Sequence, residues 1–250
     1  MKVDWSPLKH ELGEWRAAGL TLPLWWRDDD AVAPTESLAR LESLSATSGV
    51  PVHMAVIPRD ATRSLADDLS DQFIPVVHGW AHVNNQTEGK KAEFGMGRDA
   101  HAARLDLQQS MARMRDLFGA RLAPMFVPPW NRFDAALLPT LAEFGIDALS
   151  TYLPRQTATP IAGVTQINTH IDPIFWRGTR GLVPPDDLVA QTVALLQARR
   201  TGMQDNAEPL GYLTHHLVHD ADIWEFSQQF MQEMCDGPVR LYRHDTKGFS

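Results

Sequence analysis

The hydrophobic positions of this chain follow two patterns that alternate along its length. Short runs rich in apolar residues occur at 22–27, 52–57, 73–77, 125–127, 146–150, 164–168 and 210–214. Such runs, bounded by polar residues, glycine or proline, are typical of strands buried in a parallel sheet. Between them lie segments whose apolar residues recur every three or four positions, which is the spacing of an amphipathic helix. The pattern therefore predicts alternating strands and helices.

Capping residues mark the ends of the predicted helices. The first three open at Ser6, Thr35 and Asp99 and end at Gly19, Gly49 and Gly119. In the third of them we expect Leu105, Ala112 and Leu117 to form part of the buried face. Later helices are predicted at 134–144, from residue 184 and after residue 220.

Parallel strands joined by crossover helices are the natural outcome of this alternation. The 250 residues suit a single domain over 1–250 with an α/β fold, an irregular TIM-like (β/α) barrel of seven or eight strands. An open doubly wound sheet is the alternative, although the glycine-rich phosphate loops of its nucleotide-binding versions are absent. In a barrel, the active site is expected at the carboxyl ends of the strands.

Composition narrows the expected partners and compartment. With 23 lysines and arginines against 31 aspartates and glutamates, and no basic stripe, the chain is not expected to bind nucleic acid. The single cysteine, Cys235, cannot form an internal disulfide. The start of the chain lacks the pattern of a signal peptide, and no apolar run approaches the roughly 18 residues of a membrane span. We therefore expect a cytoplasmic protein, of an oligomeric state that the composition leaves open.

The end of the first predicted strand carries Asp28, Asp29 and Asp30 in succession. Adjacent carboxylates repel one another, and a bound cation would offset that repulsion. An acidic surface turn is the ordinary alternative. The pair His78 and His82 favours a metal, because i, i+4 spacing on a helical turn would place both rings on one face. One carboxylate with two histidines, leaving positions open for water, is typical of a catalytic metal site.

Together these motifs resemble the polysaccharide deacetylase family, also called NodB-like or carbohydrate esterase. An aspartate pair on the first strand, the His-x-x-x-His motif, a proline-centred motif at 125–132 and a late strand ending in histidine at 213–220 stand in the family's order. The resemblance covers residues 20–225. It implies the irregular barrel and a metal-dependent hydrolysis of an acetamide. One divalent ion is expected, with Zn²⁺ as the default and Co²⁺, Ni²⁺ or Fe²⁺ as alternatives.

The resemblance assigns roles to the acidic run, in a register that is open by one residue. Asp29 as general base and Asp30 as metal ligand is the favoured assignment, because Ala31 then stands where the family usually has a small residue. Asp28 as base and Asp29 as ligand is the shifted alternative.

The same resemblance assigns the histidines. His78 and His82 match the metal-binding histidines of the second motif. His215 is the favoured general acid, which protonates the leaving amine, and His216 is the alternative. Asp172 is expected to tune this acid.

Two positions depart from the family's pattern. Phe126 stands where typical members have the arginine that orients the base, and Arg132 or Arg27 is expected to replace it. In the fourth motif, Asp172–Trp176, phenylalanine replaces the second aspartate.

Several aromatic and neighbouring residues are expected to contact the substrate, because aromatic faces suit sugar rings. The predicted substrate-binding residues are Trp80, Pro128, Trp130, Trp176 and His170. Residues 83–98, rich in asparagine, glycine and lysine, predict a long loop that forms a lid or wall. His53, within an apolar run, is expected to be a hydrogen-bonded core residue.

Three functions fit these observations. The first is a metal-dependent hydrolase that removes an acetyl group from an N-acetylated sugar in a nucleotide, glycolipid or oligosaccharide. The second is an inactive, metal-containing barrel that binds a glycan or a partner, which the missing arginine favours. The third is a metal amidase for a small non-sugar amide, with the same site and a different pocket. Turnover separates the second function from the other two.

Overall fold

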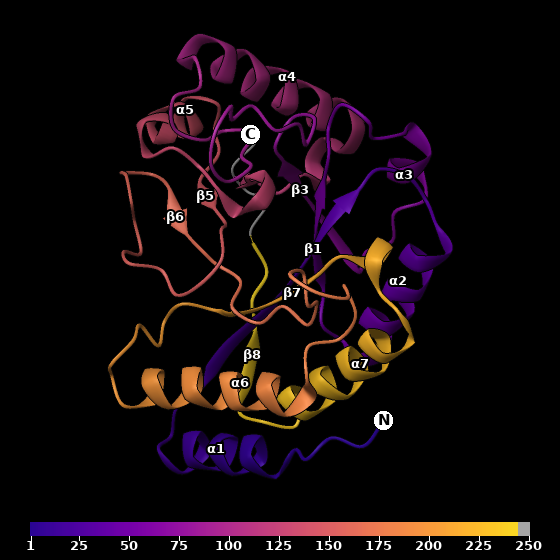
Figure 1. The fold of residues 1–250 in the computed structure, drawn as a ribbon, viewed down its shortest axis with the longest axis vertical. Helices are drawn as coiled ribbons and strands as arrows, with labels where there is room; N and C mark the ends of the chain where they lie inside the picture. The colour runs from indigo at the N-terminus through magenta and orange to yellow at the C-terminus, as the bar shows by residue number, and fades with distance from the viewer. Residues whose placement is uncertain (245–250) are drawn as a thin grey trace.

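The computed structural model describes residues 1–244, in which helices surround a curled sheet (Figure 1). The strands are β1 (Leu22–Ala31), β2 (Val52–Val56), β3 (Phe73–His78), β4 (Met125–Val127), β5 (Ala148–Leu149), β6 (Thr165–Gln166), β7 (Leu210–Thr214) and β8 (Val239–Leu241). The helices are α1 (Ser6–Ala17), α2 (Glu36–Ser48), α3 (Arg63–Asp67), α4 (Ala100–Phe118), α5 (Leu138–Glu143), α6 (Pro185–Arg200) and α7 (Ala221–Cys235). Short 3₁₀ turns are η1 (Gly119–Arg121), η2 (Pro129–Asn131), η3 (Ala135–Leu137) and η4 (His216–Val218). None of the helices described is long and apolar enough to cross a membrane.

The strands are ordered β6-β5-β4-β3-β2-β1-β7, and β8 pairs with the start of β1. Every pairing is parallel. Strands β1 to β6 are neighbours in chain order, as in a barrel, whereas a doubly wound sheet would reverse its order in the middle. Between β6 and β7 the sheet is bridged by isolated pairs such as Ile171–Tyr212. The expected irregular α/β barrel is confirmed as a curled, incompletely closed parallel sheet.

Strand β1 divides its side chains between two cores. Trp25 belongs to a small apolar cluster with inward-facing residues of β2 to β5, and Trp26 to the large cluster between sheet and helices. Because side chains alternate along a strand, Arg27 and Asp29 share the face of Trp25, and Asp28 shares that of Trp26. Neighbouring aspartates therefore start on opposite faces of the sheet.

The predicted caps of α2 and α4 are present, but the buried face of α4 differs from the prediction. Thr35 accepts a hydrogen bond from the N–H of Leu38, and Asp99 from that of Ala102. Leu105 is 42% exposed, so its expected place in the buried face is wrong. Leu117 is buried, as expected. The other apolar residues of the buried face are Ala103, Leu107, Met111, Met114 and Phe118. Ala112 also faces solvent.

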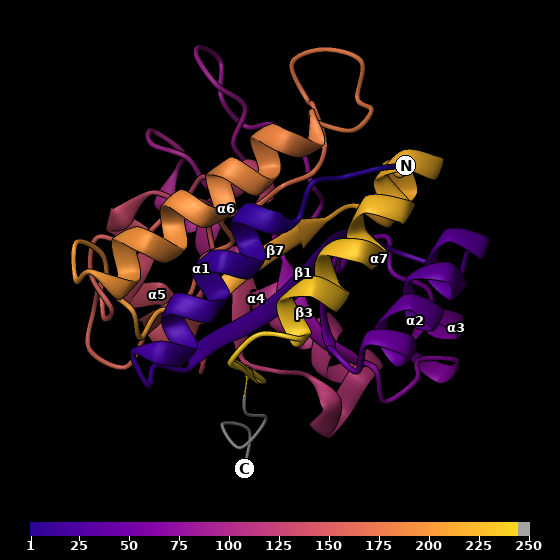
Figure 2. The same cartoon turned by 90° about the horizontal axis from the view of Figure 1, so that it is seen from below.

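Other elements differ in length from the prediction. The helix expected at 134–144 is divided into η3 and α5, and Pro139 lies in the first turn of α5, where its missing N–H is tolerated. The strand expected at 146–150 has only two residues in β5. The pattern did not predict β8, a three-residue edge strand with partly exposed side chains. Figure 2 shows the loops that follow β3 and precede α6 rising on the same side of the molecule.

Candidate metal centre and active site

Asp30, His78 and His82 meet beyond the carboxyl ends of β1 and β3. The Nε2 atoms of His78 and His82 lie 3.2 and 3.4 Å from Asp30 Oδ1. His78 Nδ1 donates to the carbonyl of Val127 at 3.0 Å, which leaves Nε2 as its free nitrogen. Asp30 Oδ1 is buried and has no hydrogen-bond partner among residues 1–244. One ligand atom from each residue lies within 4.8 Å of the others, so the donor set fits a divalent cation.

The backbone bends sharply at two of these candidate ligands. Asp30 and His82 have φ values of 76° and 54°, in the left-handed region that non-glycine residues rarely occupy. The pairing of β1 with β2 shifts register between Asp28 and Ala31, and this irregularity turns Asp30 out of the alternation and toward His78. His82 lies in a loop rather than on a helical turn. The expected proximity of the histidines is observed, but the helical reason for it is wrong.

A buried carboxylate holds the loop between the two histidines. Glu93 accepts hydrogen bonds from the N–H groups of Trp80 and Ala81 at 3.1 and 2.8 Å. Gly79 has φ 58°, and a Cβ there would lie 2.1 Å from Glu93 Oε2, so only glycine fits. Burial raises the pKa of Glu93, against the effect of the two N–H groups. Sequence reasoning missed Glu93, which lies within the predicted loop and has no motif of its own.

Asp29 lies on the inner face of the sheet and is paired with Arg27. Arg27 Nε lies 2.9 Å from Asp29 Oδ1, and Nη2 donates to Oδ2 at 2.9 Å. The guanidinium also donates to Ser150 Oγ and Asn131 Oδ1, both at 2.7 Å. Both members of the pair are buried. A two-point contact with a planar guanidinium fixes the orientation of the carboxylate.

Of the two arginines that could replace the family's arginine, the structure brings Arg27 to Asp29. Arg132 instead donates to the carbonyl of Lys91, in the 83–98 loop. Phe126, at the position of the family's arginine, is buried among apolar residues and packs against Phe94 and Phe133. The guanidinium beside Asp29 therefore comes from two residues earlier in the same strand, and not from the proline-centred motif at 125–132.

His215 faces Asp29 across the site. Its Nε2 lies 3.9 Å from Asp29 Oδ2, and its ring packs edge-on against Trp176 with centroids 4.7 Å apart. Trp176 Nε1 in turn donates to Asp172 Oδ2 at 2.7 Å. Burial raises the pKa of Asp172, although the charge of His215 opposes the shift. Asp172 is thus connected to His215 through the indole of Trp176.

Asp28 contacts the chain on both sides of His215. Its Oδ1 lies 2.5 Å from His216 Nδ1, and its Oδ2 accepts from the Thr214 hydroxyl at 2.6 Å and from the His216 N–H at 3.0 Å. Burial alone would raise the pKa of Asp28, but the charge and hydrogen bond of His216 outweigh it and lower that pKa. The pKa of His216 is raised because Asp28 outweighs the opposite effect of burial. Asp28 and His216 form a buried pair that holds the backbone around His215.

We expect Asp28→Asn to lower the free energy of unfolding by about 3 kcal/mol, because it leaves a buried imidazolium without its partner. The contribution of Asp28 to the free energy of unfolding is fully present above its ordinary pKa of 3.8. It is lost as the pH falls through the lowered pKa that Asp28 has in the folded protein. The contribution of His216 is fully present below pH 6.5, its ordinary pKa. It is lost as the pH rises through the raised pKa that His216 has in the folded protein. Urea unfolding should therefore show the largest difference between about pH 4 and 6.5. Exposed Asp71→Asn is the control, and a difference independent of pH would contradict the assignment.

The remaining predicted contact residues lie at different distances from the metal triad. The Trp130 ring lies 4.4 Å from that of His82, within the strained turn after β4. Pro128 is buried at the start of that turn. Trp80 is half-buried and packs against the large apolar cluster, so it supports the loop from below.

His170 does not line the site, and the expectation that it contacts substrate is wrong. Its side chain is completely buried, its Nδ1 accepts from the N–H of Gly211 at 3.0 Å, and its Nε2 lies 3.3 Å from Glu208 Oε2. Both ring nitrogens are therefore used inside the protein. His53 is the core residue that was predicted. It contacts the Trp26 carbonyl, and burial lowers its pKa to about 3.

A cavity of 710 Å³ adjoins the site. It reaches Asn131 and Thr151, which also contact Arg27. Its other wall includes Gln86, Lys90 and Met96 from the 83–98 loop. That loop is therefore a wall of the cleft, as one of the two predicted alternatives states.

Comparison with known proteins finds a likeness in structure alone. No family model matches the sequence, and no curated protein is similar enough to serve as a relative. A family 4 carbohydrate esterase from Streptomyces lividans, solved with acetate, matches with a TM-score of 0.57 and 14% identity over 90% of this chain and 94% of that one. A CE4 esterase from Streptococcus mutans matches with a TM-score of 0.57 and 13% identity over 94% and 91%. The peptidoglycan deacetylase PdaC from Bacillus subtilis matches with a TM-score of 0.52 and 13% identity over 88% and 87%. The chain therefore has the fold of the CE4 polysaccharide deacetylases.

Proposed function

We propose that this chain, with its CE4 fold, is a metal-dependent hydrolase that removes an acetyl group from an N-acetylated sugar or glycoconjugate. The observation that carries the proposal is the meeting of Asp30, His78 and His82, next to a carboxylate, Asp29, that does not belong to this triad and is paired with Arg27. The Streptomyces lividans esterase with this fold was solved with acetate, which supports an acetyl group as the part removed.

The residues divide into a metal-binding set and a proton-transferring set. A divalent ion, proposed as zinc, held by Asp30, His78 and His82 would polarise the acetamide carbonyl and make water more acidic. Asp29 accepts the proton of the attacking water, and Arg27 keeps its carboxylate pointed into the site. His215, on the other side of Asp29, donates a proton to the leaving amine.

The case for an inactive barrel rested on Phe126 in place of arginine. Arg27 supplies that guanidinium with a two-point contact at 2.9 Å. The departure in sequence is thus compensated in space, and the proposed base is oriented. A non-sugar amidase would share this site and differ in the substrates accepted by the adjoining cavity.

Acetate release by the purified, metal-loaded protein tests the proposal. We expect release from N-acetylglucosamine oligomers, UDP-N-acetylglucosamine or both, and none from simple anilides. The assay should be run after reconstitution with Zn²⁺, Co²⁺, Ni²⁺ and Fe²⁺ separately. Release from the anilides alone would favour the amidase, and a loaded protein that releases acetate from neither class would overturn the proposal.

A further inference from the structure

The segment from Asp172 to Leu182 forms the rim of the site on the side of His215. It is an ordered turn, because the N–H of Phe175 donates to the Gly181 carbonyl at 2.8 Å. Phe175 and Trp176 are nevertheless 46% and 40% exposed. Figure 2 shows this segment, in orange, standing out from the body of the protein on the same side as the loop after β3.

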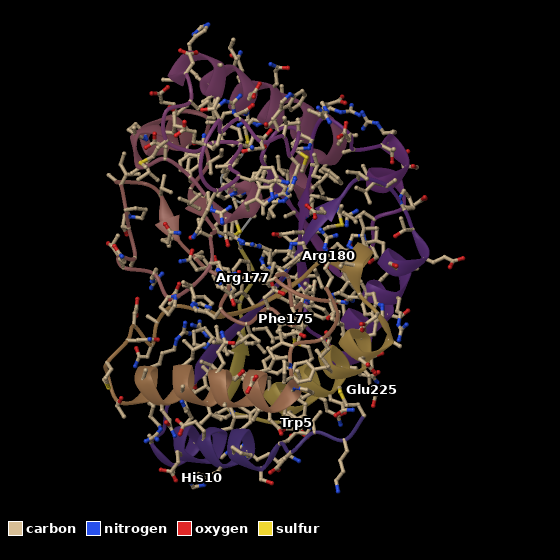
Figure 3. The ribbon with its side chains drawn as sticks, viewed as in Figure 1. Trp5, His10, Phe175, Arg177, Arg180 and Glu225 are labelled. Carbon is tan, nitrogen blue, oxygen red and sulfur yellow. The ribbon has the colours of Figure 1, made fainter. Side chains whose placement is uncertain are left out.

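Two arginines of this rim have no acidic partner. Arg177 and Arg180 are exposed and form no hydrogen bond or ion pair with residues 1–244. Figure 3 places both near the centre of the view, close to the label of Phe175. The Arg180 guanidinium carbon lies 6.0 Å from the centre of the Trp176 ring.

The carboxylates near this segment are already used. Asp172 accepts from Trp176 Nε1 and from the N–H of Ile174. Asp220, close to Gly181, caps α7 by accepting from the N–H of Ile223 at 2.8 Å. Neither lies within ion-pair distance of an arginine of the rim in the described part of the chain. The two guanidinium groups are therefore available to an external anion.

The 710 Å³ cavity that adjoins the site adds further basic groups. Lys90 and Arg132 line the 710 Å³ cavity, in which Glu88 is the acidic residue. The chain as a whole carries a net charge of −8. A mouth with four basic side chains on an acidic protein is suited to attract a negatively charged substrate.

We propose that Arg177 and Arg180 bind phosphate, so that the substrate is an N-acetylated sugar joined to a phosphate or diphosphate group. This inference rests on the proposed function and selects among its substrates. Guanidinium groups bind phosphate oxygens through short, charge-assisted hydrogen bonds. Trp176 is near both Arg180 and His215, because its ring centre lies 6.0 Å from the Arg180 guanidinium carbon and 4.7 Å from the centre of the His215 ring. A sugar ring against this indole would have its acetamide near His215 and its phosphate near the arginines.

The Arg177→Ala/Arg180→Ala double variant tests this assignment by a split between KM and kcat. We expect KM for UDP-N-acetylglucosamine to rise at least about tenfold with kcat within about twofold, because the arginines contact a part of the substrate that does not react. KM for neutral N-acetylglucosamine oligomers should not change. Lysine at both positions should restore part of the affinity. Arg240→Ala, which removes an exposed arginine of β8, is the matched control.

Two sources of the phosphate are separated by the choice of substrate. UDP-N-acetylglucosamine represents a nucleotide-linked sugar, and a short-chain prenyl diphosphate N-acetylglucosamine represents a lipid-linked one. Turnover of either, with KM dependent on the arginines, supports the proposal and identifies the source. Equal KM values in wild type and double variant for both would overturn it.

A binding measurement keeps this test independent of turnover. We expect calorimetry with inorganic pyrophosphate to show binding that weakens in the double variant and at high salt, since exposed charges are screened. The metal ligands are the same in both proteins, so the difference reports the arginines. Pyrophosphate affinity equal in the two proteins would overturn the phosphate site. Binding that depends on the arginines without acetate release from any substrate would overturn the proposed function alone.

Discussion

Asp30→Asn and His78→Ala are each expected to remove the metal and to reduce acetate release to background. Asp30 is the only carboxylate of the triad, and its buried Oδ1 lies 3.2 Å from His78 Nε2. Loss of an outer partner of a metal ligand already costs about 10–100-fold in affinity, and loss of a ligand should cost more. Metal content after chelation and reloading, measured by mass spectrometry beside acetate release, provides both readouts.

Two controls accompany this experiment, a measurement of folding and the substitution of a histidine outside the site. His10→Ala removes an exposed imidazole of α1, far from the site in Figure 3, and should leave metal content unchanged. Circular dichroism should show that the Asp30→Asn variant remains folded, because Asp30 is only partly buried, and it reports whether loss of the buried His78 ring disturbs the fold. One ion per chain retained in a folded Asp30→Asn protein would contradict the triad.

The sequence predicted those residues of the candidate site that lie at or just after the carboxyl ends of strands. The runs before Asp28 and His78 predict parallel strands, and parallel strands deliver their last residues to one edge of the sheet. The structure accordingly brings Asp30, His78 and His82 together. The register of the three aspartates was open because alternation alone cannot locate the irregularity of β1. The left-handed backbone at Asp30 turns its carboxylate toward His78, which favours Asp30 as the candidate ligand.

The parts that the sequence did not predict depend on contacts across the fold. Arg27 was only an alternative to Arg132, because nothing in the local sequence shows which guanidinium enters the curled sheet. Glu93 has no periodic signal and acts through the backbone of residues 80 and 81. The place of His170 in the chain, two residues before Asp172, suggested a residue of the cleft. It is instead buried in the core, where it contacts Glu208 and the N–H of Gly211, about forty residues later in the chain.

Asp29→Asn is expected to lower kcat by about 10²–10⁴ while the metal is retained, because the amide cannot accept the proton of water. The substitution keeps the shape of the side chain, and its oxygen can still accept from Arg27. Single-turnover acetate release and metal content on the same protein measure the two quantities. Circular dichroism and a thermal unfolding curve show whether loss of the negative charge beside Arg27 disturbs the fold.

Asp28→Asn under the same assay completes the assignment of the three aspartates. In the shifted register Asp28 is the base and Asp29 a ligand, so that Asp29→Asn would release the metal and Asp28→Asn would abolish turnover with the metal in place. The geometry predicts instead that Asp29→Asn retains the metal and loses turnover, whereas Asp28→Asn affects mainly the stability of the fold. Asp28 contacts His216 and Thr214 rather than the triad, so its loss should weaken folding more than chemistry. Metal loss in Asp29→Asn would therefore refute the base assignment and move each aspartate's role by one residue.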